Sequence, residues 1–131
     1  MIKPEDIAHM AQELQNHDIC ATEVYYRNVI GRWYYSAFGQ TKSWLENNFS
    51  NELQDAEGAT HERIKNCCYN LQRTKMDLSF SKLGRLINEL HHRRVKADYH
   101  LEKTVVKNEV FEAELRYTTI INLINELSEK Y

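Results

Sequence analysis

The chain has 131 residues and a formal net charge of −2, with 17 lysines and arginines against 19 aspartates and glutamates. A nearly neutral protein has no global field that attracts nucleic acid, so contact with RNA would require a local basic patch. No apolar run approaches the roughly 20 residues that span a bilayer, so no membrane association is expected. The odd number of cysteines, with Cys67 next to Cys68, indicates a reduced, cytoplasmic protein.

The low content of proline and glycine predicts long helices with few interruptions. A first helix is predicted over about 4–16, because Pro4 fits a first helical turn. A second is predicted over about 18–47, with Asp18 as its N-cap. Apolar residues recur there at steps of three and four, which is typical of a helix that packs into a core. They are Tyr26, Ile30, Trp33, Ala37 and Trp44, flanked by Tyr34, Phe38 and Leu45.

The segment 46–63 lacks this periodicity and predicts a loop, with Asn47 or Asn48 near the end of the second helix. A third helix is predicted over about 59–73, with Thr60 as its N-cap. Its apolar side comprises Ile64, Cys67, Cys68 and Leu71.

The fourth helix is predicted to begin near Asp77 or Ser79, and one of its seam positions holds a charge. Arg94 stands where the spacing calls for an apolar residue. A buried guanidinium is costly unless it is paired or hydrated, so we expect a cleft, an interface or a partner there. The seam runs through Phe80, Leu83, Ile87, Leu90, Arg94 and Ala97.

The last helix, over about 104–129, has the most regular seam, which suits an antiparallel bundle or a dimer interface. The chain is therefore predicted to be a single all-α domain over 1–131, an up-and-down bundle of four to five helices. The seam residues are Val106, Val110, Ala113, Tyr117, Ile120, Ile124 and Leu127.

Three segments, in this order and spacing, resemble those of small bacterial HEPN-domain proteins. The first is a helix with an arginine, a tyrosine, an alanine and a phenylalanine, matched here by Arg32, Tyr34 or Tyr35, Ala37 and Phe38. The second is the Thr-His pair in "ATHERI", which opens a later helix. The third is the Arg-x-x-Ala-Asp-Tyr signature, matched by "RRVKADY". The resemblance covers most of residues 20–130.

The resemblance implies a HEPN-like helical bundle that forms homodimers. Many members are metal-independent endoribonucleases that act as toxins or in antiviral defence. Their motif is an arginine, four to six residues and a histidine, which fits both Arg94 and Arg93 when paired with His100. Other members are non-catalytic and partner a minimal nucleotidyltransferase. Two departures bear on this alternative. Val95 follows Arg94 where the catalytic branch has a polar residue, although Arg93, if it is the motif arginine, is followed by the polar Arg94. The Ala-Asp-Tyr branch often lacks the histidine, which His100 restores in this chain.

The chemistry expected of an Arg/His pair is the cleavage of RNA through its own 2′-hydroxyl. His100 would transfer protons near neutral pH, and Arg94 would hold the phosphate. Arg93, Lys96 and His92 would form the local basic patch that binds RNA. In a continuous helix, six residues separate the pair by ~9 Å along the axis and ~120° around it. The two would therefore meet only if the helix loosens, or if two subunits share one cleft.

No cofactor or metal is expected. His61 and Cys68 would lie two helical turns apart and Cys67 would point elsewhere, and no third or fourth ligand stands at the spacing expected for zinc.

Overall fold

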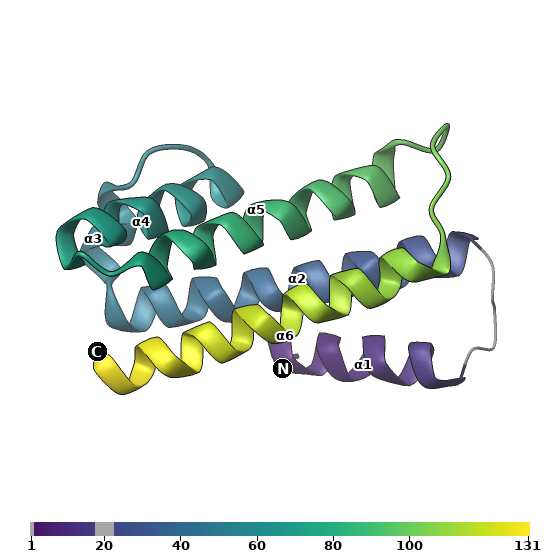
Figure 1. The fold of residues 1–131 in the computed structure, drawn as a ribbon, viewed down its shortest axis with the longest axis horizontal. Coiled ribbons are helices and arrows are strands. Elements are labelled where there is room, and N and C mark those ends of the chain that lie inside the picture. Colours follow the sequence, from purple (N-terminus) through teal and green to yellow (C-terminus); the bar gives the residue numbers. More distant parts are fainter. Residues whose placement is uncertain (1, 18–22) are drawn as a thin grey trace.

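The computed structural model describes residues 2–17 and 23–131, and within them the chain is entirely helical apart from short connections (Figure 1). The predicted all-α fold class is confirmed. The predicted N-cap of the second helix, Asp18, lies outside the described residues. The helices are α1 (Pro4–His17), α2 (Glu23–Asn48), α3 (Ser50–Asp55), α4 (Thr60–Lys75), α5 (Leu78–Tyr99) and α6 (Lys107–Lys130).

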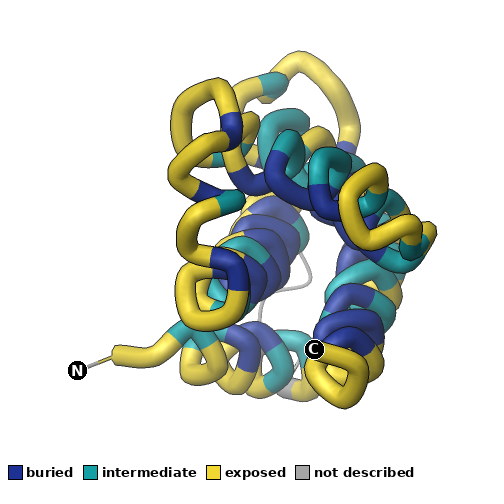
Figure 2. Tube along the Cα trace, turned by 90° about the vertical axis from the view of Figure 1, so that its left-hand side faces the viewer, coloured by how far each residue is buried: buried dark blue, intermediate teal, exposed yellow. Residues whose placement is uncertain are grey.

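The three longest helices, α2, α5 and α6, run along the long axis of the molecule and pack on one another (Figure 1). Helix α1 lies along α2, whereas α4 lies along α5 at the other end of the molecule. Buried residues line the inner side of each helix (Figure 2). Among the described residues, no helix has both the length and the apolar content of a membrane span.

The predicted seams of α5 and α6 form much of the core. Phe80, Leu83, Ile87 and Leu90 are fully buried, as the spacing predicted. In α6 the seam is buried from Val110 onward, with Tyr117 half-buried. Val106 is an exception: it is 51% exposed, because it is the N-cap residue and precedes the first helical turn. The apolar repeat therefore placed the start of the last helix about three residues too early.

Helix α3 was not predicted, because segment 46–63 was interpreted as a loop. Helix α2 ends at Asn48, as expected, but Phe49 and Leu53 are buried and hold a short helix against the end of the bundle. The Phe49 ring meets the rings of Trp44, Phe80 and Tyr131 at centroid distances of 5.5–6.0 Å. Two apolar residues four positions apart are therefore enough to anchor a helix of about one and a half turns.

The ends of α4 and α5 show which capping predictions were correct. Thr60 is the first helical residue of α4, and the N-cap is Ala59, which has no capping side chain. Asp77 does cap α5, since its carboxylate accepts a hydrogen bond from the Ser79 backbone N–H at 3.0 Å. Between the two helices, Met76 adopts a left-handed conformation with φ 52°, which reverses the chain.

Helices α4 and α5 cross at short range through small side chains. A β-carbon added to Gly84 would lie 3.1 Å from the Cys68 Cβ. Cys67 and Cys68 are both fully buried. Burial raises the pKa of the Cys67 thiol to about 11 and raises that of Cys68 further. Both cysteines are therefore protonated packing residues at neutral pH.

Candidate functional site

The basic stretch 91–100 does not form one site, because its side chains leave α5 in three directions. His91 faces α4 and α2, where it stacks on His61. Arg94 faces α2, where it contacts Tyr35. Arg93 faces α6. The geometry of the helix therefore directs side chains that are adjacent in the sequence towards three different neighbouring helices.

Arg94 lies in a cage of one carboxylate and three phenol rings. Its Nε is 2.9 Å from Asp98 Oδ2, an ion pair one helical turn along α5 that is not aligned as a hydrogen bond. Its Nη2 donates to the Tyr35 hydroxyl at 2.5 Å and to the Tyr99 hydroxyl at 3.4 Å. The guanidinium lies 5.1–5.9 Å from the ring centroids of Tyr34, Tyr35 and Tyr99.

This cage compensates for the cost of burying a guanidinium at the seam position of Arg94. The Arg94 side chain is only 16% exposed, and its charge is balanced by Asp98 and by the negative faces of the aromatic rings. The expected cleft or interface is therefore not required to bury this arginine. A phosphate could bind the guanidinium only by competing with Asp98.

His100 directly follows the last residue of α5, and its imidazole contacts Glu102. It is the C-cap residue, and its imidazole, 45% exposed, has its Nδ1 3.3 Å from Glu102 Oε1. Helix α5 stays regular through Tyr99, so it does not loosen in the way that would bring Arg94 and His100 together. Within the described residues, no hydrogen bond, ion pair or ring contact joins the two.

Arg93, Lys96 and His92 line a shallow depression of about 360 Å³ between α5 and α6. The basic groups here are paired with acidic ones. Arg93 Nη1 lies 2.7 Å from Glu112 Oε2, and Lys96 Nζ lies 2.8 Å from Glu109 Oε1. The three residues predicted to bind RNA do lie together, but their charge is largely balanced.

Arg27 was not singled out in the sequence, yet it holds the end of α5 in place. Its side chain is buried and donates hydrogen bonds to four backbone carbonyls at the end of α5 and in the loop that follows. Glu23 Oε1 pairs with it at 3.0 Å and also accepts the Val105 N–H at 2.7 Å. The four carbonyls belong to Lys96, Ala97, His100 and Lys103.

A second unpredicted cluster lies between α2, α4 and α5. The imidazole rings of His61 and His91 stack with centroids 3.7 Å apart and planes 18° from parallel. His61 Nδ1 is 3.1 Å from the Tyr34 hydroxyl, and its Nε2 is 3.3 Å from Asn88 Oδ1. Burial raises the pKa of Tyr34 to about 12, so the phenol stays protonated and donates to His61.

Two tyrosines of the Arg94 cage are exposed on the outer surface. Tyr35 is 44% and Tyr99 is 65% exposed. Next to them is a depression of about 320 Å³ lined by Asn28, Gly31, Arg32, Tyr35 and Asp98. Met10 of α1, 53% exposed, borders it through a 3.3 Å contact between its sulfur and Arg32 Nε. We call Met10, Arg32, Tyr35, Arg94 and Tyr99 the tyrosine surface.

Arg32 differs from the other arginines of this region. Its Nη1 donates to the backbone carbonyl of Asn28 at 3.3 Å, and within the described residues no carboxylate lies at ion-pair distance from it. The tyrosine surface therefore combines exposed aromatic area with a cation that lacks a neutralising partner there.

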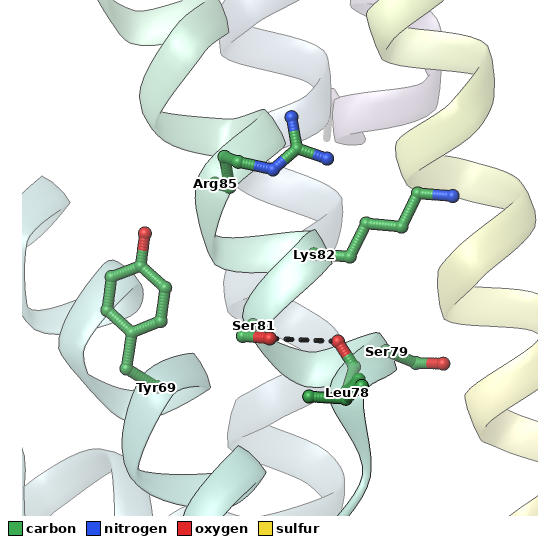
Figure 3. Close-up of a pocket in the computed structure, with 6 residues that line it drawn as sticks. All are labelled: Tyr69, Leu78, Ser79, Ser81, Lys82 and Arg85. Atoms are coloured by element: carbon green, nitrogen blue, oxygen red, sulfur yellow. Dashed lines mark hydrogen bonds between the residues drawn. The ribbon is translucent and has the colours of Figure 1, made fainter.

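A larger depression, of about 470 Å³, lies over α4 and the start of α5 (Figure 3). Its polar side chains do not converge: Lys82 extends toward α6, whereas the Tyr69 hydroxyl is on the opposite side of α5. The Ser81 hydroxyl donates to the Leu78 carbonyl at 2.9 Å. Among the described residues, no group of three or more histidines, cysteines or carboxylates is arranged to hold a metal ion.

The sequence matches no protein-family model, and neither curated proteins nor solved structures include a significant match.

Proposed function

We propose that this protein is a HEPN-like binding module that associates with another protein through the tyrosine surface. The observation that supports this most is the arrangement of Arg94, which is held by Asp98 between the exposed phenols of Tyr35 and Tyr99. Tyrosine, arginine and methionine are the residue types enriched at the centres of protein interfaces. Rings fixed by a shared arginine also lose little conformational entropy on binding.

The charge of the surface indicates what the partner would present. Arg32 lacks an ion pair within the described residues and borders the depression beside Tyr35. An acidic side chain of the partner would pair with Arg32 in the depression beside Tyr35. The HEPN resemblance makes a minimal nucleotidyltransferase the first candidate partner, in the cytoplasm. A second copy of this chain, forming a homodimer, is the next candidate.

The test is co-expression with a minimal nucleotidyltransferase, followed by co-purification and measurement of affinity. Tyr35→Ala and Tyr99→Ala should each weaken the complex at least about tenfold, as expected for interface centres. Phe111→Ala, which removes an aromatic ring of similar exposure from α6, should leave affinity unchanged. Equal effects of all three substitutions, or a complex that none of them weakens, would overturn the proposal.

Charge reversal distinguishes a specific contact with an acidic residue of the partner from non-specific association. Arg32→Glu should abolish the complex, whereas Lys82→Glu, an equal charge change on the exposed side of α5, should not. The solution mass of the isolated protein, measured by light scattering, decides whether a second copy occupies the surface instead. A protein that is monomeric alone and forms a heterodimer on co-expression would favour the nucleotidyltransferase as the partner.

A metal-independent endoribonuclease, acting as a toxin or defence effector, is the second candidate. The observation that favours it is the accessible imidazole of His100, which another protomer could reach. Arg94 of one protomer and His100 of its partner would then line a shared RNA cleft. Single-stranded RNA incubated with wild-type protein and EDTA should then be cleaved, and His100→Ala should remove that activity. Cleavage lost in His100→Ala would refute a purely non-catalytic module.

A further inference from the structure

The stacked histidines connect the first turn of α4 to the middle of the bundle. His61 is the second residue of α4, and His91 lies in the C-terminal half of α5. With the Asn88 amide oriented as in the structure, its carbonyl accepts from His61 Nε2, and His61 Nδ1 accepts from Tyr34. This arrangement fixes one neutral tautomer of His61. A second proton, on Nδ1, would require the Tyr34 hydroxyl to change from donor to acceptor.

His91 is poorly placed to take up a second ring proton. Its Nδ1 is buried and has no hydrogen-bond partner, so a proton there would have no acceptor. The charged and titratable groups that face the pair come from three helices. They are Tyr34 from α2, Glu62 and Lys65 from α4, and His92 and Arg94 from α5. Glu62 is the one acidic group among these, and it already pairs with Lys65 at 3.0 Å.

We propose that the His61–His91 pair is an acid-sensitive latch: neutral rings hold the start of α4 against α5 and α2, and protonation of both rings releases it. Two charged imidazoles with centroids 3.7 Å apart repel each other, and Arg94 repels them further. Glu62, their acidic neighbour, offsets this repulsion only weakly. The start of α4 lacks one common stabilising contact, because its N-cap Ala59 provides no side-chain hydrogen bond. The latch does not depend on what the tyrosine surface binds.

The direction of the titration agrees with this geometry. Burial lowers the pKa of both histidines, and that of His91 falls to about 4, with His61 and Arg94 as further causes. A folded-state pKa below the ordinary 6.5 means that the unfolded or opened state binds more protons. The latch is therefore closed above about pH 6.5 and is progressively lost as the pH falls toward 4.

The experiment is amide hydrogen exchange of the full chain between pH 7 and pH 4, expressed as protection factors. Protection of the first two turns of α4 should fall at least about tenfold more than that of the α6 core. His91→Phe, which keeps a ring in the stack but cannot be charged, should retain this protection at pH 4. His92→Gln, which alters the exposed neighbour, should behave like wild type. His91→Gln serves as a second uncharged variant if the larger phenylalanine disturbs the fold.

Histidine NMR titration gives an independent readout. The His91 ring resonances should titrate well below pH 6.5, and the line shapes of α4 amides should change over the same interval. Titration of both rings near the ordinary value would overturn the latch. So would an acid-induced loss of α4 protection that is the same in His91→Phe as in wild type.

Discussion

Replacing Arg27 by methionine tests whether one buried guanidinium holds the end of α5 to α2. Methionine keeps most of the apolar stem and removes the donors, so the change isolates the polar contacts from the packing. In the native chain these donors reach backbone carbonyls at the end of α5 and in the loop that follows. The same side chain is 8% exposed, so water cannot easily replace it.

The expected cost follows from the kinds of contact that are lost. A hydrogen bond from a charged donor contributes roughly 1.5–3 kcal/mol, and breaking a buried ion pair costs about 3–5 kcal/mol. The Arg27 contacts are not additive, since they share one side chain and the outer carbonyls can be rehydrated. Glu23 is partly exposed and keeps its bond to the Val105 N–H. We therefore expect a loss of about 3 kcal/mol in the free energy of unfolding.

Urea denaturation followed by circular dichroism measures this loss. With a slope of about 2 kcal/mol per molar, the midpoint should fall by about 1.5 M. Arg32→Met is the matched control, because Arg32 lies on the same helix and has no carboxylate partner among the described residues; its loss should stay near 0.5 kcal/mol. If Arg27→Met costs less than about 1 kcal/mol, or no more than the control, the carbonyl contacts do not stabilise the fold.

Two further substitutions test local features of the helices. Gly39→Ala should destabilise by about 1–3 kcal/mol in the same assay, because its new Cβ would lie 2.8–2.9 Å from the ring carbons of Pro4 and push α1 away. Gly31→Ala should be neutral or stabilising by up to about 1 kcal/mol, since that Cβ would be 3.7 Å from its nearest neighbour. If both alanine variants lost the same free energy of unfolding, the close approach of α1 to Gly39 would be contradicted. Asp77→Ala should cost about 1 kcal/mol at neutral pH through loss of the cap. The Ser79 backbone N–H lowers the pKa of Asp77, so this cost should persist above pH 4 and vanish once the native carboxyl is protonated; a cost independent of pH would refute the role of the carboxylate.

The helices could be predicted because their periodicity is local. Phe80, Leu83 and Ile87 repeat within one helix, so their spacing is sufficient to identify the buried face. The same reasoning identified Arg94 as a charge at an apolar position. Helix α3 was missed although Phe49 and Leu53 carried a short signal, because polar residues surround them.

The candidate site could be predicted only in part, because its geometry depends on how the helices are packed. The partner of Arg94 is Tyr35, which lies 59 residues away, and its position depends on the rotation of α2 against α5. Arg27 looks like an ordinary surface cation in the sequence, since nothing local shows that the end of another helix lies against it. The spacing of Arg94 and His100 matched a motif, but spacing alone does not reveal that the helix remains regular between them.

The two adjacent thiols of α4 give the protein an internal chemical reporter. Cys67 and Cys68 are fully buried and hold their protons at neutral pH, so alkylating reagents should reach them only when α4 separates from α5. In a Cys20→Ser background, the rate of their modification would measure how often that helix pair parts in an intact chain. The close packing of Cys68 against Gly84 thereby allows the opening of this bundle to be timed without introducing a new reactive residue into the chain.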